Sequence, residues 1–94
     1  MATFKVKQVI DGDTFDVEPN WEWSGKTGTR VRPTRFNAPE INTLGGQSAK
    51  RKLSNLILGK QVELREAKTI DRGRLVCDVY FSGRHLAGYF PEYA

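Results

Sequence analysis

The stretch QSAKRKLSNLIL, residues 47–58, predicts one helix set among strands, and this arrangement narrows the choice of fold more than any other segment. Its apolar side chains recur at i, i+4, i+7 and i+8, which gathers them on one face of a helix: Ala49, Leu53, Leu56 and Ile57. Gly59 follows directly, and glycine commonly ends a helix because it adopts the left-handed backbone conformation. We therefore expect one amphipathic helix over residues 47–58.

Three segments before this helix alternate apolar and polar residues, the pattern of half-buried strands. They cover residues 3–10, 14–18 and 30–36. Proline lacks the N–H that a strand ladder needs. We therefore expect Pro19 to stop the second strand or place it at an edge, and Pro33 to mark an edge or a bulge.

Residues 20–29 are expected to form a long hairpin tip between the second and third strands. The tip contains Trp21 and Trp23, for which two interpretations stay open. Bases stack on exposed aromatic rings, so the pair could form a nucleic-acid platform. We favour the other interpretation, in which the indoles cap the barrel as part of its core.

Two further alternating segments follow the helix, at residues 60–68 and 75–81, with a turn at residues 71–74 between them. Residues 84–94 are expected to begin a short helix that Pro91 ends. The order is thus three strands, a helix and two strands. It matches an α+β protein, a five-stranded OB-fold barrel with one main helix between the third and fourth strands.

The composition indicates one small globular domain, residues 1–94, with surplus positive charge. Hydrophobic residues make up 38% and charged residues 28%, which argues against a disordered chain. The net charge of +4 favours anionic partners such as nucleic acid or an acidic membrane surface. Cys77 is the only cysteine, so it can form neither an internal disulfide nor a cysteine metal cluster.

Neither a secretory signal nor a membrane span is visible in the sequence. Met1 and Ala2 lead directly into an alternating segment without an apolar signal region. A run of about 18 apolar residues, which a spanning helix needs, does not occur. We expect a monomeric, cytoplasmic protein without membrane contact, unless the domain is processed from a secreted precursor.

Two carboxylates lie one residue apart in the sequence DGD, residues 11–13. The simplest interpretation is a turn. Asp13, however, shares the parity of Phe15 and Val17, and a carboxylate facing the core is costly unless it is paired or binds a metal. An EF-hand calcium loop is excluded, because Phe15 and Asp16 occupy positions that need an oxygen ligand and a glycine.

The sequence NAPE, residues 37–40, supplies further oxygen ligands. Hard cations bind carboxylate, amide and backbone carbonyl oxygens, so Asp13, the Asn37 side chain and the Ala38 carbonyl could hold one together. Glu40 would then lie near the metal and could take a proton from water.

Arg32 and Arg74 are the candidate phosphate ligands. Phosphoryl transfer develops charge on the equatorial oxygens and the leaving group, and guanidinium groups stabilise that charge. For any single arginine, an ordinary surface position is the alternative. We expect His85 to be a surface residue and Cys77 to be inert core packing.

These motifs together resemble the staphylococcal nuclease family over about residues 4–90. The resemblance rests on VIDGDT, an arginine five residues before NAPE, QSA at the helix start, an LGKxV turn, and DRGR, at residues 9–14, 32–40, 47–49, 58–62 and 71–74. It implies an OB-fold domain that hydrolyses DNA and RNA phosphodiesters with calcium and little sequence specificity. The domain is expected to be short at its C-terminus relative to the family.

The resemblance also implies a role for each matching residue. Asp13 matches a metal ligand, Ala38 a backbone-carbonyl ligand, and Glu40 the general base. Arg32 and Arg74 match the arginines that grip the scissile phosphate, and Asp11 matches an acid that supports the metal less directly. Asn37 stands where the family has aspartate, so we expect weaker calcium binding, since affinity falls with ligand charge.

The leading interpretation is therefore a metal-dependent nuclease. The alternative is a non-catalytic OB-fold module that binds nucleic acid and has a degenerate metal site. A barrel that binds peptides or proteins and keeps a vestigial site is a third possibility.

Overall fold

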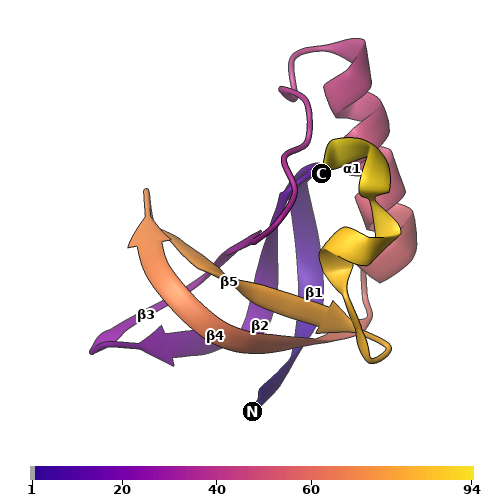
Figure 1. Cartoon of the computed structure of the whole chain (residues 1–94). Helices are drawn as coiled ribbons and strands as arrows, with labels where there is room; N and C mark the ends of the chain where they lie inside the picture. The colour runs from indigo at the N-terminus through magenta and orange to yellow at the C-terminus, as the bar shows by residue number, and fades with distance from the viewer. Residues whose placement is uncertain (1) are drawn as a thin grey trace.

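The structure, a computed structural model, describes residues 2–94 as a strand barrel with one α-helix (Figure 1). Its elements, in chain order, are β1 (Ala2–Asp11), β2 (Thr14–Trp23), β3 (Lys26–Pro33), α1 (Leu44–Ile57), β4 (Gln61–Asp71), β5 (Arg74–Phe81), β6 (Arg84–His85) and the 3-10 helices η1 (Leu86–Tyr89) and η2 (Pro91–Tyr93). No helix among these residues is long and apolar enough to cross a membrane.

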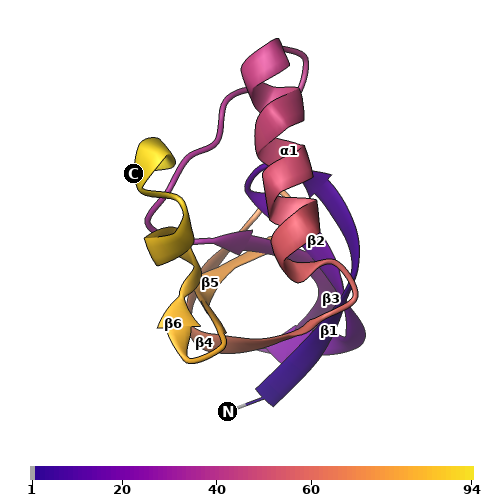
Figure 2. The same ribbon diagram turned by 90° about the vertical axis from the view of Figure 1, so that its right-hand side faces the viewer.

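The strands are hydrogen-bonded in the order β3-β2-β1-β4-β5-β6. β3 also pairs in parallel with β5, from Val31 beside Leu75 to Pro33 beside Cys77, and this pairing closes five strands into a mixed barrel. Figure 2 shows the ring of strands with α1 beside it. The predicted OB-fold, with its helix between the third and fourth strands, is confirmed.

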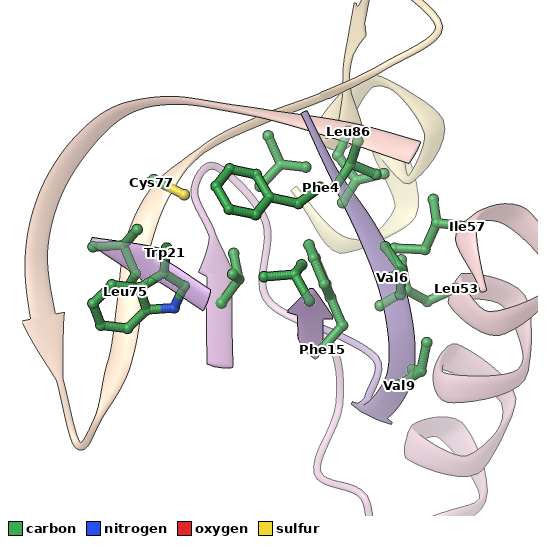
Figure 3. Packing of buried hydrophobic residues seen from close by; sticks show 14 of the residues in the cluster. Phe4, Val6, Val9, Phe15, Trp21, Leu53, Ile57, Leu75, Cys77 and Leu86 are labelled. Atoms are coloured by element: carbon green, nitrogen blue, oxygen red, sulfur yellow. The ribbon is translucent and has the colours of Figure 1, made fainter. Parts of the chain in front are cut away.

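The helix packs on the barrel through the predicted apolar face. Leu53 and Ile57 are fully buried beside Val6 and Val9 of β1 (Figure 3). The helix begins at Leu44, three residues earlier than expected, because the Thr43 hydroxyl accepts the Gly46 N–H at 3.0 Å and caps the first turn.

The β2–β3 hairpin differs from the prediction. β2 does not stop at Pro19 but runs to Trp23, and only Ser24 and Gly25 form the tip. Pro19 lies where the β2–β3 register shifts, between Asp16 and Trp21, so the missing N–H breaks no regular ladder.

Trp21 explains why the hairpin strands extend so far. Its side chain is 3% exposed, and its Nε1 donates to the Arg30 carbonyl at 2.9 Å. A Cβ on Gly28 would lie 2.8 Å from the indole, so glycine is needed opposite it. The structural interpretation of Trp21 is confirmed, and Trp23 packs half-buried against the same core.

The segment after β5 also differs, because His85 is not a surface residue. Its side chain is 12% exposed, with Nε2 lying 3.6 Å from Asp78 Oδ1. Its Nδ1 accepts the Ala87 N–H at 3.0 Å and caps η1. β4 likewise extends beyond the expected Lys68 to Asp71. Cys77 is buried as expected, and burial raises the pKa of its thiol to about 12.

Candidate functional site

A polar hollow of about 470 Å³ lies where four segments meet: the β1–β2 turn, the end of β3, the loop after β3, and the β4–β5 turn. Its lining includes every site residue expected from the sequence, Asp13, Arg32, Asn37, Ala38, Glu40 and Arg74, together with Asp11, Pro39, Ile41 and Arg72. The residues are therefore neighbours in space, although they range from Asp11 to Arg74 in the chain.

Asp13 lies in the β1–β2 turn, with its side chain 15% exposed. Its Oδ2 accepts the Ala38 N–H at 3.0 Å and lies 3.5 Å from Arg32 Nη2. Burial raises the pKa of Asp13, and the neighbouring Asp11 adds to this effect. The Ala38 N–H and the Arg32 charge act in the opposite direction but do not outweigh burial. Asp13 thus keeps unmet demand for positive charge.

Arg32 turns back onto the loop that follows its own strand. Its Nη1 donates to the Phe36 carbonyl at 3.1 Å and to the Pro33 carbonyl, and its Nη2 donates to Asn37 Oδ1. Both terminal nitrogens are thus engaged by the protein. An anion entering the hollow would have to share this guanidinium with Asn37 or draw it away.

The loop that carries Glu40 is joined to the start of α1. The Glu40 carbonyl accepts the Thr43 N–H at 3.1 Å and the Thr43 hydroxyl at 2.7 Å. A Cβ on Gly46 would lie 1.7 Å from that carbonyl oxygen, so only glycine allows this approach. Glu40 itself is exposed and lines the hollow, where water can reach its carboxylate.

Gly12 has a similar role on the other side of the loop. A Cβ there would lie 2.6 Å from the Cβ atoms of both Ala38 and Ala49. From the sequence, Gly12 was expected only as part of a turn, and no role was expected for Gly46. Gly46 directly precedes the helical pattern of residues 47–58, so the pattern gave no signal for it.

Arg74 is held at the start of β5 by Asp71, across the two-residue turn. Its Nη2 lies 2.7 Å from Asp71 Oδ2, and its Nε donates to the Asp71 carbonyl at 3.3 Å. Its Nη1 approaches the Thr14 hydroxyl at 3.5 Å. Sequence reasoning missed Asp71 as the positioning partner and Arg72 as a third arginine of the hollow. The available signal was the tight turn itself, with Asp71 and Arg74 at its ends and Arg72 within it.

The donors around the hollow suit a hard cation by type. Carboxylate oxygens of Asp11, Asp13 and Glu40 and the amide oxygen of Asn37 are the ligands that Ca²⁺ and Mg²⁺ prefer. Within residues 2–94, however, no three His, Cys, Asp or Glu side chains are grouped closely enough to hold a metal. A cation would therefore need Asn37, the Ala38 carbonyl, water or substrate oxygens as well.

Arg32 contacts two of those ligands, Asp13 Oδ2 and Asn37 Oδ1. A cation bound between Asp13 and Asn37 would compete with the guanidinium for the same oxygens. The arrangement combines a partly buried acid, an accessible carboxylate and three arginines in one hollow. Such a set can bind a phosphate and remove a proton beside it.

The chain was compared with known proteins. No family model matches it. It is 35% identical over 77 residues to the micrococcal nuclease of Shigella flexneri. The match covers 81% of this chain and 41% of that protein, so the chain spans about two fifths of its relative's length. The similarity supports a nuclease-like relationship.

Proposed function

We propose that this chain hydrolyses phosphodiester bonds of DNA or RNA, with calcium and little sequence specificity. One observation carries the proposal: arginines and carboxylates from four segments line a single polar hollow. The nuclease-like similarity and the net charge of +4 support a polyanionic substrate.

Arg32 and Arg74 would bind the scissile phosphate. Each guanidinium is already oriented by a carboxylate or amide oxygen, so little ordering remains when the phosphate arrives. Both would stabilise the charge that grows on the phosphate oxygens in the transition state.

Glu40 would act as the general base. It is exposed at the rim of the hollow, and its backbone is fixed by Thr43. A water molecule beside its carboxylate could lose a proton to it while attacking phosphorus.

Asp13, Asn37 and the Ala38 carbonyl would hold the cation. Bound calcium would supply positive charge to polarise the phosphate. Asn37 contributes an oxygen without a negative charge, so we expect the affinity to be modest.

Glu40→Gln tests the mechanism, because it removes the base and keeps the size of the side chain. We expect cleavage of single-stranded DNA in calcium to fall by about 10²–10⁴-fold, without a change in the unfolding midpoint. Glu22→Gln is the matched control, an exposed glutamate outside the hollow, and it should cleave like the wild type. Unchanged cleavage by Glu40→Gln would reject the role of Glu40.

A non-catalytic nucleic-acid-binding module is the second candidate. It is favoured by the contacts of Arg32 with Asn37 and Asp13, since the guanidinium already occupies oxygens that a cation would need. Salt-sensitive binding of single-stranded DNA, without cleavage in calcium or chelator, would select this function. Absence of binding at low salt would reject both candidates.

A further inference from the structure

The last turn of the described chain lies beside the loop of the candidate site. η2 and its preceding residue, residues 90–93, run next to both α1 and the loop that follows β3 (Figures 1 and 2). We call this segment the C-terminal turn. None of its residues lines the polar hollow.

Three successive residues of the loop, Phe36, Asn37 and Ala38, each have one backbone group that is held by a different part of the molecule. The Phe36 carbonyl accepts from Arg32 at 3.1 Å, and the Ala38 N–H donates to Asp13 at 3.0 Å. Between them, the Asn37 N–H donates to the Tyr93 carbonyl at 2.8 Å. Arg32 and Asp13 are themselves site residues, whereas Tyr93 belongs to the C-terminal turn.

Aromatic packing fixes the position of the Tyr93 carbonyl. The Phe36 and Phe90 rings stack at 5.4 Å between centroids, and Phe90 and Tyr93 stack at 6.0 Å. Phe36 and Phe90 are 2% and 4% exposed, so this stack is rooted in the core. The Tyr93 N–H donates to the Phe90 carbonyl at 3.0 Å and closes the turn.

Lys52 on α1 contacts the outer side of the same turn. Its Nζ lies 3.2 Å from Glu92 Oε2 and 5.6 Å from the centre of the Tyr93 ring. Both charged side chains are about half exposed, and pairs of this kind contribute little. The aromatic stack is therefore the main support of the turn.

From these contacts we infer that the C-terminal turn positions the candidate site, with Tyr93 as its positioning residue. Through the Asn37 N–H, the Tyr93 carbonyl sets the direction in which Asn37 and Ala38 present their oxygens to the hollow. The effect on cleavage rests on the proposed function, but the effect on the loop does not.

Tyr93→Ala tests the inference, because it removes the ring that stacks on Phe90. Amide hydrogen exchange measured by NMR reports the Asn37 N–H directly. We expect Asn37 to exchange about three to ten times faster, the ratio that corresponds to loss of one aromatic contact. The amide of Val31, buried in β3, is the internal reference.

Two variants separate positioning from general stability. Tyr93→Phe keeps the ring and should restore wild-type exchange at Asn37. Tyr89→Ala makes the same change on η1, where the tyrosine contacts Phe81 and Arg84 and not the loop, and it should leave the ratio of Asn37 to Val31 unchanged. Unchanged Asn37 exchange in Tyr93→Ala, or an equal increase in Tyr89→Ala, would overturn the inference.

Cleavage of single-stranded DNA in calcium is measured on the same three variants. We expect kcat to fall about three- to tenfold in Tyr93→Ala alone, in step with the loosened Asn37 amide. Equal kcat in Tyr93→Ala and Tyr89→Ala would overturn the role in cleavage. If the wild type does not cleave, the proposed function fails, while hydrogen exchange still decides whether the turn positions the loop.

Discussion

Asp13 and Asp78 are both largely buried carboxylates, with side chains 15% and 8% exposed, and both contact residues at or just after the end of β3. Their surroundings shift the pKa values of the two carboxyl groups in opposite directions. The Thr34 hydroxyl lowers the pKa of Asp78, helped by a hydrogen bond from His85 and by nearby positive charges. Burial raises the pKa of Asp13 in spite of Arg32.

The difference separates an aspartate whose charge the fold stabilises from one that faces the hollow. Asp78 has its partners within the fold and ties the segment after β3 to β5 and β6. Asp13 faces a hollow, shares its surroundings with Asp11, and would gain from one more positive charge. Unmet electrostatic demand in a hollow is typical of a functional site.

Asp13→Asn should produce the largest effect if this comparison is right. The change removes the negative charge of a proposed metal ligand and keeps the shape of the side chain. We expect cleavage to fall by about 10²–10³-fold, with no loss of unfolding free energy in chelator. Calcium-dependent cleavage assays and urea titrations measure the two quantities. Retained cleavage together with lost stability would place Asp13 in the same class as Asp78.

Asp78→Asn should have the opposite outcome. It weakens a charged acceptor shared by Thr34 and His85, so the free energy of unfolding should fall by about 2 kcal/mol. Cleavage per folded molecule should stay at the wild-type level. Urea denaturation followed by fluorescence measures the first quantity, and a loss of specific activity would contradict the division of roles.

Asn37→Asp sharpens the comparison by adding charge beside Asp13. If Asn37 is a ligand, calcium should bind about tenfold more tightly, in spite of competition from Arg32. Calorimetric titration checks this. The control is Asn55→Asp, on α1 and outside the hollow, which should not change calcium affinity.

The smallest expected effect is the pH dependence that Asp78 contributes. Its pKa in the folded state lies below the ordinary value of 3.8, so its stabilisation is complete above that pH. The stabilisation should be lost as the pH falls through the folded pKa. The difference in unfolding free energy between wild type and Asp78→Asn should therefore shrink only below about pH 4. A difference that already shrinks at pH values well above about 4 would contradict the assignment to Asp78.

The sequence predicted the barrel well because its signals are local. Alternation located the strands, and the spacing of Leu53 and Ile57 located the buried face of the helix. The hairpin at residues 20–29 was mispredicted because Pro19 was expected to end the strand before Trp21, whereas β2 runs to Trp23. Burial of the Trp21 indole and the hydrogen bond from its Nε1 to the Arg30 carbonyl extend the strand beyond Pro19.

The candidate residues could also be chosen from sequence, because acids, an amide and arginines in short motifs are visible there. The residues that hold these candidates in place could not be chosen from the sequence. Gly46 is required by the Glu40 carbonyl, six residues earlier across a bend, and the Asn37 N–H donates to the backbone carbonyl of Tyr93 in the C-terminal turn. His85 was placed wrongly because its burial depends on packing against Thr34, which lies 51 residues earlier in the chain, and on the neighbouring Asp78 of β5.

The order of the elements and the chemical types at the hollow can therefore be inferred from the residues alone. Both follow from side-chain identity and from periods of two and 3.6 residues. The tertiary structure was needed to show which buried aspartate has its charge stabilised within the fold and which also faces the hollow. It also decided that Arg32 contacts Asn37 and that the C-terminal turn holds the loop. These outcomes depend on distances between segments that meet only when β3 closes onto β5.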